Sequence, residues 1–371
     1  MNYELFFVTL PCQIFNVQSS MFNVTLAEKA VELLCRLISV PRISREETAA
    51  ADLLQDYMSR ELGLDVKRDG NNLWSVSPCL DAAKQTLLLN AHIDTVKPVA
   101  GWQRDPFTPT REDDRIYGLG SNDDGASLVT LLHVFATLKD KDTPYNLVFL
   151  ASAEEEVSGK GGIESVLPLL PQIDVALVGE PTGMQPAIAE KGLMVLDVTA
   201  RGKSGHAARD EGDNAIYRAM DDIAWFRNYK WEKESPLLGA VKMSVTIINA
   251  GTQHNVVPDT CTFTVDVRSN ECYTNRELLD VIRRHVRSEV VPRSTRLSSS
   301  GIDINHPLVQ RILAMGGKPF GSPTLSDQAL MPFPSLKMGP GQSSRSHTAD
   351  EYIEVGEIRE AIDSLLAALG S

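Results

Sequence analysis

Cysteine is scarce in this chain and is never placed for cross-linking. The five cysteines among 371 residues are odd in number and scattered, and none belongs to a Cys-x-x-Cys pair. This distribution argues against a disulfide framework and against a thiolate metal site. It indicates a reducing compartment, and we therefore expect a cytoplasmic protein.

Long apolar runs and an excess of basic residues are lacking as well. No apolar stretch approaches the roughly 20 residues that span a membrane, and the apolar patch at residues 5–10 has no Lys or Arg before it, unlike a secretory signal. The 36 Lys and Arg residues face 49 Asp and Glu residues, which gives a net charge of −13. We therefore expect neither nucleic acid nor membrane as a partner.

The remaining composition is that of a globular enzyme, and its patterns predict two domains. Strand-like and helix-like stretches alternate up to about residue 187, which predicts an α/β domain with a mixed, mostly parallel sheet flanked by helices. Residues 188–300 change to the order β-α-β-β-α-β of an inserted ferredoxin-like α+β domain. The catalytic domain is thus expected at residues 22–187 and 301–371.

The ends of several elements can also be read from the sequence. Capping boxes at Thr25–Glu28 and Ser44–Glu47 predict two early helix starts, and residues 1–20 are interpreted as a dispensable upstream extension. Within the inserted domain, strands are expected at 194–200, 241–249, 260–267 and 295–299, and helices at 214–229 and 274–287.

A buried strand at Leu87–Leu89 runs into His92-Ile93-Asp94. Side chains of a strand alternate between its faces, so His92 and Asp94 point to the same side. A carboxylate in that position can hold one imidazole nitrogen while the other binds a metal ion. A polar strand end at the surface is an equally good interpretation of this stretch alone.

Other acidic residues and one more histidine also follow expected strands or lie in the loops behind them. In an open α/β sheet, ligands bind beyond the carboxyl ends of the strands. One histidine with two carboxylates is a frequent zinc site, and two such sets that share a carboxylate hold two ions. The candidate residues are His92, Asp123, Glu155, Glu156, Glu180 and His347.

These motifs, in this order, resemble those of the co-catalytic zinc aminoacylase and carboxypeptidase family, the M20 metallopeptidases. The similar stretches are His92–Asp94, Gly118–Asp123, Glu155-Glu156, Gly179–Thr182 and the loop with His347. The resemblance implies that His92 and Glu180 bind one Zn²⁺ and that Glu156 and His347 bind another, with Co²⁺ or Mn²⁺ as possible substitutes.

The same resemblance assigns the other roles around the metals. It implies that Asp123 bridges the two ions, although Asp124 directly after it is the alternative, and the glycine spacing favours Asp123. Glu155 would be the general base and Asp94 the partner of His92. The Gly118-Leu119-Gly120 stretch also suggests a dinucleotide fingerprint, but the sixth position holds Asp123 instead of glycine.

Three residues of the inserted domain match substrate-binding positions of the family. His206 resembles the histidine that reaches the active site of a partner subunit, which implies a homodimer. Arg268 would bind a substrate carboxylate through its planar fork, and Asn255 would hold a neighbouring polar group. The histidines His133, His285 and His306 are interpreted as structural, and Glu154 as a solvated neighbour.

The overall length and the Gly339-Pro340-Gly341 stretch look most like the acetylornithine deacetylase branch. We therefore expect a hydrolase that removes an acetyl or succinyl group from N-acyl-ornithine in arginine biosynthesis. Basic residues near the motifs, Lys203, Arg209 and Arg345, favour succinyl. The alternatives are a succinyl-diaminopimelate desuccinylase, a di- or tripeptidase of the family, and a non-catalytic binding protein of the same fold.

Overall fold

The structure, a computed structural model, describes residues 13–209 and 211–370. The chain divides into two compact units, and the second unit interrupts the first twice along the sequence. The first unit takes the chain up to Ile173 together with Gly179–Met184 and Met338–Ser371, and the second takes Asp174–Val178 and Gln185–Lys337. The domain bounds expected from the sequence stay a prediction.

The first unit contains four neighbouring strands of a mixed sheet. Its strands lie in the order β1-β2-β6-β3, with β3 parallel to β6 and the other neighbours antiparallel. Both β3 and β6 are buried along their whole length, which explains their nearly continuous apolar sequences. The bounds are β1 Lys67–Asp69, β2 Asn72–Val76, β3 Thr86–His92 and β6 Asn146–Ser152.

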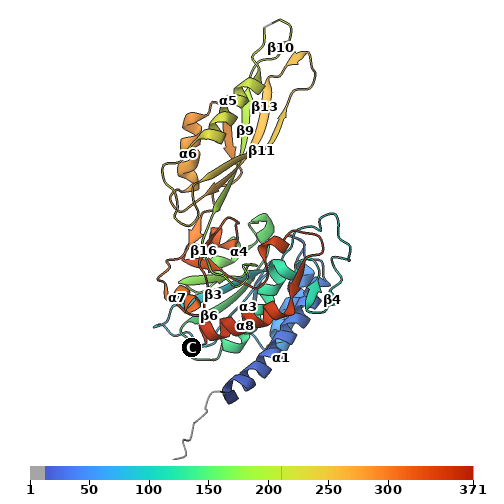
Figure 1. Cartoon of the computed structure of the whole chain (residues 1–371), viewed down its shortest axis with the longest axis vertical. Coiled ribbons are helices and arrows are strands. Elements are labelled where there is room, and N and C mark those ends of the chain that lie inside the picture. Colours follow the sequence, from blue (N-terminus) through green and yellow to red (C-terminus); the bar gives the residue numbers. More distant parts are fainter. Residues whose placement is uncertain (1–12, 210, 371) are drawn as a thin grey trace, which may run out of the picture. The chain divides into compact units, whose positions relative to one another are not determined.

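Helices α1, α3 and α8 pack against one another in this unit, and α3 also contacts β3 and β6 (Figure 1). Almost every residue of α3 is buried, in agreement with its apolar sequence. The helices are α1 Gln13–Ile38, α2 Thr48–Asp56, α3 Ala126–Leu138, α4 Ile163–Val166 and α8 Val355–Leu369, and a π-helical turn at Tyr57–Glu61 follows α2. A separate three-stranded sheet has the order β18-β5-β4, with bounds Tyr352–Glu354, Arg115–Tyr117 and Thr110–Glu112.

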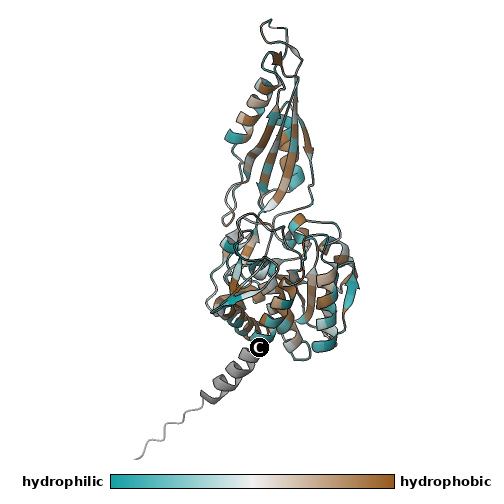
Figure 2. Cartoon of the chain, turned by 90° about the vertical axis from the view of Figure 1, so that its right-hand side faces the viewer, coloured by the Kyte–Doolittle hydropathy of each residue, from teal (hydrophilic) through white to brown (hydrophobic). Residues whose placement is uncertain are grey.

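The second unit contains the expected β-α-β-β-α-β sandwich. Its antiparallel sheet has the order β11-β13-β9-β14, and α5 and α6 lie on one face of it (Figure 1). Buried apolar side chains of β9 and β13 form a core with those of α5 and α6, so that burial alternates along both strands. Apolar parts of these strands are brown in Figure 2. The bounds are β9 Gly192–Arg201, α5 Ala215–Asn228, β11 Lys242–Ala250, β13 Thr260–Ser269, α6 Asn275–His285 and β14 Glu289–Pro292.

The remaining strands of the second unit lie in the order β7-β17-β8-β15, and β16 also pairs with β8. Both units thus combine sheets with covering helices, and the mixed α/β fold is confirmed. The further bounds are β7 Val175–Val178, β8 Ala187–Glu190, β10 Gly205–His206, β12 Val256–Val257, β15 Ser300–Gly301, α7 Pro307–Ala314, β16 Phe320–Ser322 and β17 Ser335–Lys337.

Three local predictions are wrong. Helix α1 begins at Gln13 and continues through Thr25, because no proline or glycine interrupts residues 13–38. Helix α2 begins after Glu47 without a side-chain cap, since Ser44 and Glu47 are engaged in tertiary contacts described below. The last strand of the sandwich was expected at 295–299, but it is β14, at Glu289–Pro292. Two consecutive β-branched valines in β14 favour an extended chain there.

Within the described residues, no helix is long and apolar enough to cross a membrane. Of the upstream extension expected at residues 1–20, residues 1–12 lie outside the described part of the chain, and its dispensability stays a prediction.

Candidate metal centre

The imidazole of His92 is fixed at the end of β3. Its Nδ1 lies 3.0 Å from the backbone oxygen of Asp94 and 3.4 Å from Asp94 Oδ1. Because both oxygens accept a hydrogen bond, Nδ1 carries a hydrogen, and in the neutral ring Nε2 is left as the nitrogen that can bind a cation. The two side chains are 2% and 0% exposed, so the strand end is a buried site and not a solvated surface.

The carboxylate of Asp94 connects β3 with the turn that carries the two glutamates. It accepts hydrogen bonds from the backbone N–H of Glu155 at 3.0 Å and of Glu156 at 3.2 Å, and from Ser44 Oγ at 2.7 Å. Burial tends to raise the pKa of Asp94, but the hydrogen bonds from His92, Ser44 and Glu155 outweigh it and hold the pKa below its usual value. Asp94 is therefore an ionised anchor for both the histidine and the turn.

Asp123 lies between the two histidines. Its Oδ1 is 3.2 Å from His92 Nε2, and its Oδ2 is 3.7 Å from His347 Nε2. Burial raises the pKa of this carboxyl, yet the contact with His92 lowers it overall. One carboxylate oxygen toward each histidine is the arrangement that a bridging ligand requires.

Asp124 faces a different environment. The peptide bond between Asp123 and Asp124 is cis. The Asp124 side chain is fully buried, and a Cβ added to Gly179 would lie 3.2 Å from its Oδ2. Burial raises the pKa of Asp124 to about 7. The geometry thus supports Asp123 over Asp124 as the bridging residue, and this assignment stays a proposal.

The second histidine completes the cluster. His347 Nε2 lies 3.0 and 3.1 Å from the two carboxylate oxygens of Glu156. Glu155 is also near, with its Oε2 at 4.0 Å from His92 Nε2. Ligand atoms of His92, Asp123 and Glu156 lie within 4.8 Å of one another. This set of nitrogen and carboxylate-oxygen donors suits zinc or a similar divalent ion.

The charge of the cluster also favours cations. A hydrogen bond to Glu156 and the nearby carboxylates raise the pKa of His347 to about 9. Burial alone would lower the pKa of His92, but Asp123 and Asp94 raise it well above its usual value. Carboxylates that stabilise protonated histidines would equally stabilise a bound metal ion.

Glu180 enters this region from the end of β7. The backbone N–H of the preceding Gly179 donates to Asn90 O at 2.6 Å, which places Glu180 beside the last residues of β3. A Cβ added to Gly339 would lie 2.7 Å from Glu180 O, so the glycine loop before His347 packs closely against it. Six of the expected residues, and Asp94, thus belong to one region of the first unit.

The expected substrate residues belong to the second unit and fall into two places. His206 is on β10, which pairs with β12, and the N–H of Ala207 donates to Asn255 O at 3.0 Å. Arg268 lies near the opposite end of β13 and is bound to Asp266 at 2.9 and 3.1 Å. Thr260, at the start of β13, follows β12 closely in the sequence, and Arg268 lies eight residues further along the same strand. At a rise of about 3.3 Å per residue, the two ends of this strand are roughly 26 Å apart.

Arg345 is wrongly predicted as an uncommitted cation. Its Nη1 is 2.6 Å from Glu357 Oε2 and its guanidinium lies over the Tyr352 ring at 4.4 Å. Lys203 and Arg209 are exposed. Another group of cations is not evident from the sequence. Lys242 pairs directly across from Arg268, and burial lowers the pKa of Lys191, which these two cations lower further.

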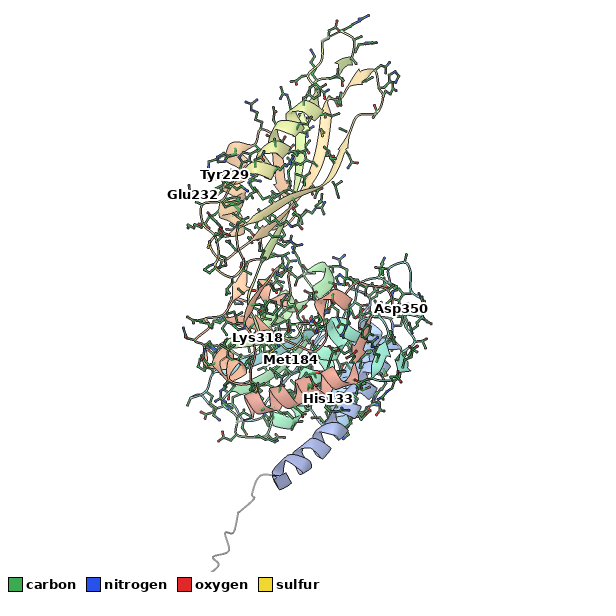
Figure 3. The ribbon with its side chains drawn as sticks, in the orientation of Figure 1. His133, Met184, Tyr229, Glu232, Lys318 and Asp350 are labelled. Atoms are coloured by element: carbon green, nitrogen blue, oxygen red, sulfur yellow. The ribbon has the colours of Figure 1, made fainter. Side chains whose placement is uncertain are left out.

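The three histidines interpreted as structural have structural contacts. His133 on α3 is buried (Figure 3), with Nε2 at 2.9 Å from Tyr57 Oη and Nδ1 at 2.7 Å from Val129 O. His306 accepts a hydrogen bond from Leu308 N–H at the start of α7, and His285 stacks on Trp225 with 5.2 Å between ring centroids.

Glu154 is only partly solvated. It has a left-handed backbone, and its Oε2 lies 3.9 Å from Arg45 Nε. Its N–H donates to the carboxylate of buried Glu47 at 3.3 Å. Glu47 also accepts from Asn71 Nδ2. The serine-to-glutamate pattern at 44–47 therefore serves the turn at Glu154–Glu156 and not a helix start.

Known proteins resemble this chain over most of its length. A family model described as peptidase family M20/M25/M40 matches residues 88–371. A Mycobacterium tuberculosis protein named as a succinyl-diaminopimelate desuccinylase is 28% identical, over 92% of this chain and 98% of its own length. The acetylornithine deacetylase of Proteus mirabilis is 26% identical, over 91% of this chain and 95% of its own.

A solved structure shows the same fold. The crystal structure of a tripeptidase from Staphylococcus aureus superposes with a TM-score of 0.73 at 20% identity, and the match covers 92% of this chain and 97% of that one.

Proposed function

Because the chain belongs to peptidase family M20/M25/M40, a family of metal-dependent hydrolases, we propose that this hydrolytic enzyme removes the acyl group from an N-acyl-ornithine. The acyl group is acetyl or succinyl, and the reaction would supply ornithine to arginine biosynthesis. The observation that carries the proposal is the position of Asp123 between His92 and His347, with Glu155 and Glu156 beside them.

The proposed ligand sets are those that the family resemblance implies, and the contacts of Asp123 and Glu156 with the two histidines support them. His92 and Glu180 would hold one Zn²⁺, Glu156 and His347 would hold the other, and Asp123 would bridge them. Bound zinc supplies a water of lowered pKa and polarises the scissile carbonyl. The three ligand carboxylates would offset most of the positive charge of the two ions.

Glu155 is the proposed proton carrier. Its N–H is held by Asp94 at 3.0 Å, and its carboxylate lies at the edge of the cluster, 4.0 Å from His92 Nε2. Glu155 would accept the proton of the attacking water and deliver it to the departing amine. His206 would donate to the tetrahedral oxyanion.

The proposed substrate contacts favour an anionic ligand. Arg268 and Lys242 lie opposite each other on neighbouring strands, and Lys191 is close enough for their charges to lower its pKa further, after burial. Asp266 offsets one of these three positive charges through its two hydrogen bonds to Arg268. The excess positive charge supports binding of the carboxylate of the ornithine part of the substrate. A succinyl group would bring a second carboxylate.

The proposed assembly is a homodimer with shared active sites. His206 and Asn255 lie on one ribbon, whereas Arg268 is at the far end of β13. That separation within one chain supports the proposal that His206 and Asn255 serve the site of a partner subunit.

A second candidate function is succinyl-diaminopimelate desuccinylation, which is favoured by the Mycobacterium tuberculosis relative that matches over 92% of this chain. Zinc-loaded enzyme should be incubated with N-acetyl-ornithine, N-succinyl-ornithine, N-succinyl-diaminopimelate and a panel of di- and tripeptides. Free amine and product masses would be recorded. The highest kcat/KM on an acyl-ornithine supports the proposal, and the highest value on the diaminopimelate derivative or a peptide refutes it.

A further inference from the structure

A buried arginine lies beneath the proposed metal centre. Arg42 is 1% exposed. Its Nη1 donates to Ile93 O and its Nη2 to Gly120 O, both at 2.8 Å. Ile93 separates His92 from Asp94, and Gly120 begins the loop that ends at Asp123. One guanidinium therefore ties together the two backbone segments that carry the proposed ligands.

Glu351 binds the same loop, but its carboxylate accepts hydrogen bonds from backbone N–H groups, whereas Arg42 donates to backbone carbonyls. Its Oε2 accepts a hydrogen bond from Gly120 N–H at 3.1 Å. Its Oε1 accepts from Asn122 N–H at 2.9 Å and from Asp123 N–H at 2.8 Å. Glu351 is 2% exposed, so it is a buried carboxylate that receives three backbone donors from one loop. The carbonyl oxygen of Gly120, in the same loop, accepts a hydrogen bond from Arg42.

The glycines of the loop are shaped around the guanidinium. Gly120 has a φ of +73°, and a Cβ there would lie 2.4 Å from Arg42 Nη2. A Cβ on Gly125 would lie 2.9 Å from the same nitrogen. The planar fork of arginine holds its N–H donors in fixed directions, which suits two carbonyls at set positions better than the rotatable ammonium of lysine. The guanidinium thus accounts for Gly120 and Gly125, whereas a Cβ on Gly118 would lie 2.4 Å from Ile38 Cγ2.

We infer that Arg42 and Glu351 are positioning residues that fix the Gly120–Asp123 loop against the end of β3. The pair sets the place of the Asp123 carboxylate between His92 and His347 and touches neither metal nor substrate. Arg42 also provides positive charge beneath a group of carboxylates that includes Asp94 and Asp124. The inference rests on the proposed function, because it requires Asp123 to hold metal.

The test compares zinc affinity with the stability of the metal-free protein. Arg42→Lys keeps the charge but loses the fork, and Glu351→Gln keeps the shape but turns one acceptor into a donor that faces Gly120 N–H. The control is Asp222→Asn. Asp222 is another buried carboxylate that accepts two backbone N–H bonds, from Arg287 at 3.1 Å and Ser288 at 2.9 Å.

Zinc affinity would be measured on metal-free, full-length protein by competition with a chromophoric chelator. Stability would be measured by thermal unfolding. We expect Arg42→Lys and Glu351→Gln to weaken zinc binding about 10- to 100-fold, the usual loss for groups that orient metal ligands. Both should lower kcat more than they raise KM. Asp222→Asn should lower the unfolding temperature and leave zinc affinity within about twofold of the intact protein.

Unchanged zinc affinity in both variants would overturn the inference, as would an equal loss of affinity in the control. If Glu351→Gln does not fold, the double variant Arg42→Gln/Glu351→Gln removes both charges together, and it must also bind zinc more weakly. Intact protein that fails to bind zinc would overturn the proposed function as well. Normal zinc binding by the intact protein and the variants alike would overturn only the positioning role.

Discussion

Asp94→Asn is expected to damage metal binding more than folding. In the intact protein, Asp94 Oδ1 accepts from Glu155 N–H at 3.0 Å and lies 3.4 Å from His92 Nδ1. Oδ2 accepts from Glu156 N–H at 3.2 Å and from Ser44 Oγ at 2.7 Å. An amide can replace only one of these oxygens as an acceptor, so one pair of contacts is lost.

The amide group should turn toward Ser44. A hydroxyl can rotate and accept a hydrogen bond, whereas Glu155 N–H and His92 Nδ1–H cannot. The remaining defect is the unpaired N–H of Glu156, which costs about 1–3 kcal/mol of folding free energy when buried. The lost charge next to His92 makes its Nε2 a weaker ligand, and a loss of about 10- to 100-fold in metal affinity follows.

Thermal unfolding with and without saturating zinc separates the two effects. If zinc binds 10- to 100-fold more weakly, it contributes about 1.4–2.8 kcal/mol less to the free energy of unfolding of the zinc-loaded protein. The zinc-induced rise in unfolding temperature should therefore shrink in Asp94→Asn. Ser44→Ala, which removes one hydrogen bond but keeps the charge, should shrink it less. An undiminished rise in Asp94→Asn would refute the reasoning.

Three further predictions concern the base, the partner subunit and acid stability. Glu155→Gln should bind zinc normally but lose about 10²–10⁴-fold in kcat, and normal turnover at full metal content would exclude Glu155 as the base. His206→Ala mixed with Glu155→Gln should regain activity in heterodimers, and no recovery after confirmed subunit exchange would reject shared sites. Burial lowers the pKa of His133 to about 4, whereas the unfolded chain takes up the proton at about pH 6.5. Because the unfolded state is protonated first, the free energy of unfolding should fall by up to about 3 kcal/mol as the pH drops from about 6.5 to 4. His133→Gln should show less of this loss in urea unfolding, and an identical pH dependence would contradict the assignment.

The sequence predicts the parts of the site that follow from strand geometry. His92 and Asp94 were placed on one side of a strand by the alternation of side chains, and the structure brings Nδ1 of the one to the carboxylate of the other. The order of the sandwich elements is likewise predictable, because β13 alternates polar and apolar residues over most of its length and the apolar stretch of β9 is long enough for a strand; burial alternates along both.

Contacts between distant backbone segments could not be predicted. Arg42 donates to carbonyls 51 and 78 residues away, and a single cation after Pro41 gives no local sign of burial. Arg345 was mistaken for an uncommitted charge because its partner, Glu357, lies on a helix twelve residues further on. The 44–47 pattern was mistaken for a cap because local propensity is easily overridden by tertiary contacts.

The acidic residues around the centre therefore divide into two kinds that look alike in the sequence. Asp123 and Glu156 point their oxygens at the Nε2 atoms of His92 and His347, as metal ligands would. Asp94, Glu351 and Glu47 point theirs at backbone N–H groups of the segments that carry Asp123 and the Glu154–Glu156 turn, and Asp94 also faces the other ring nitrogen of His92, Nδ1. Several N–H bonds can keep a buried carboxylate ionised, and the pKa of Asp94 is indeed held below its usual value. Burial instead raises the pKa of Glu351 to about 7. The role of these anchors is to orient the segments that carry Asp123, Glu155 and Glu156. Counting the acidic residues in the sequence would therefore overestimate the number of metal ligands. The direction in which each carboxylate points in the structure distinguishes a proposed ligand from an anchor.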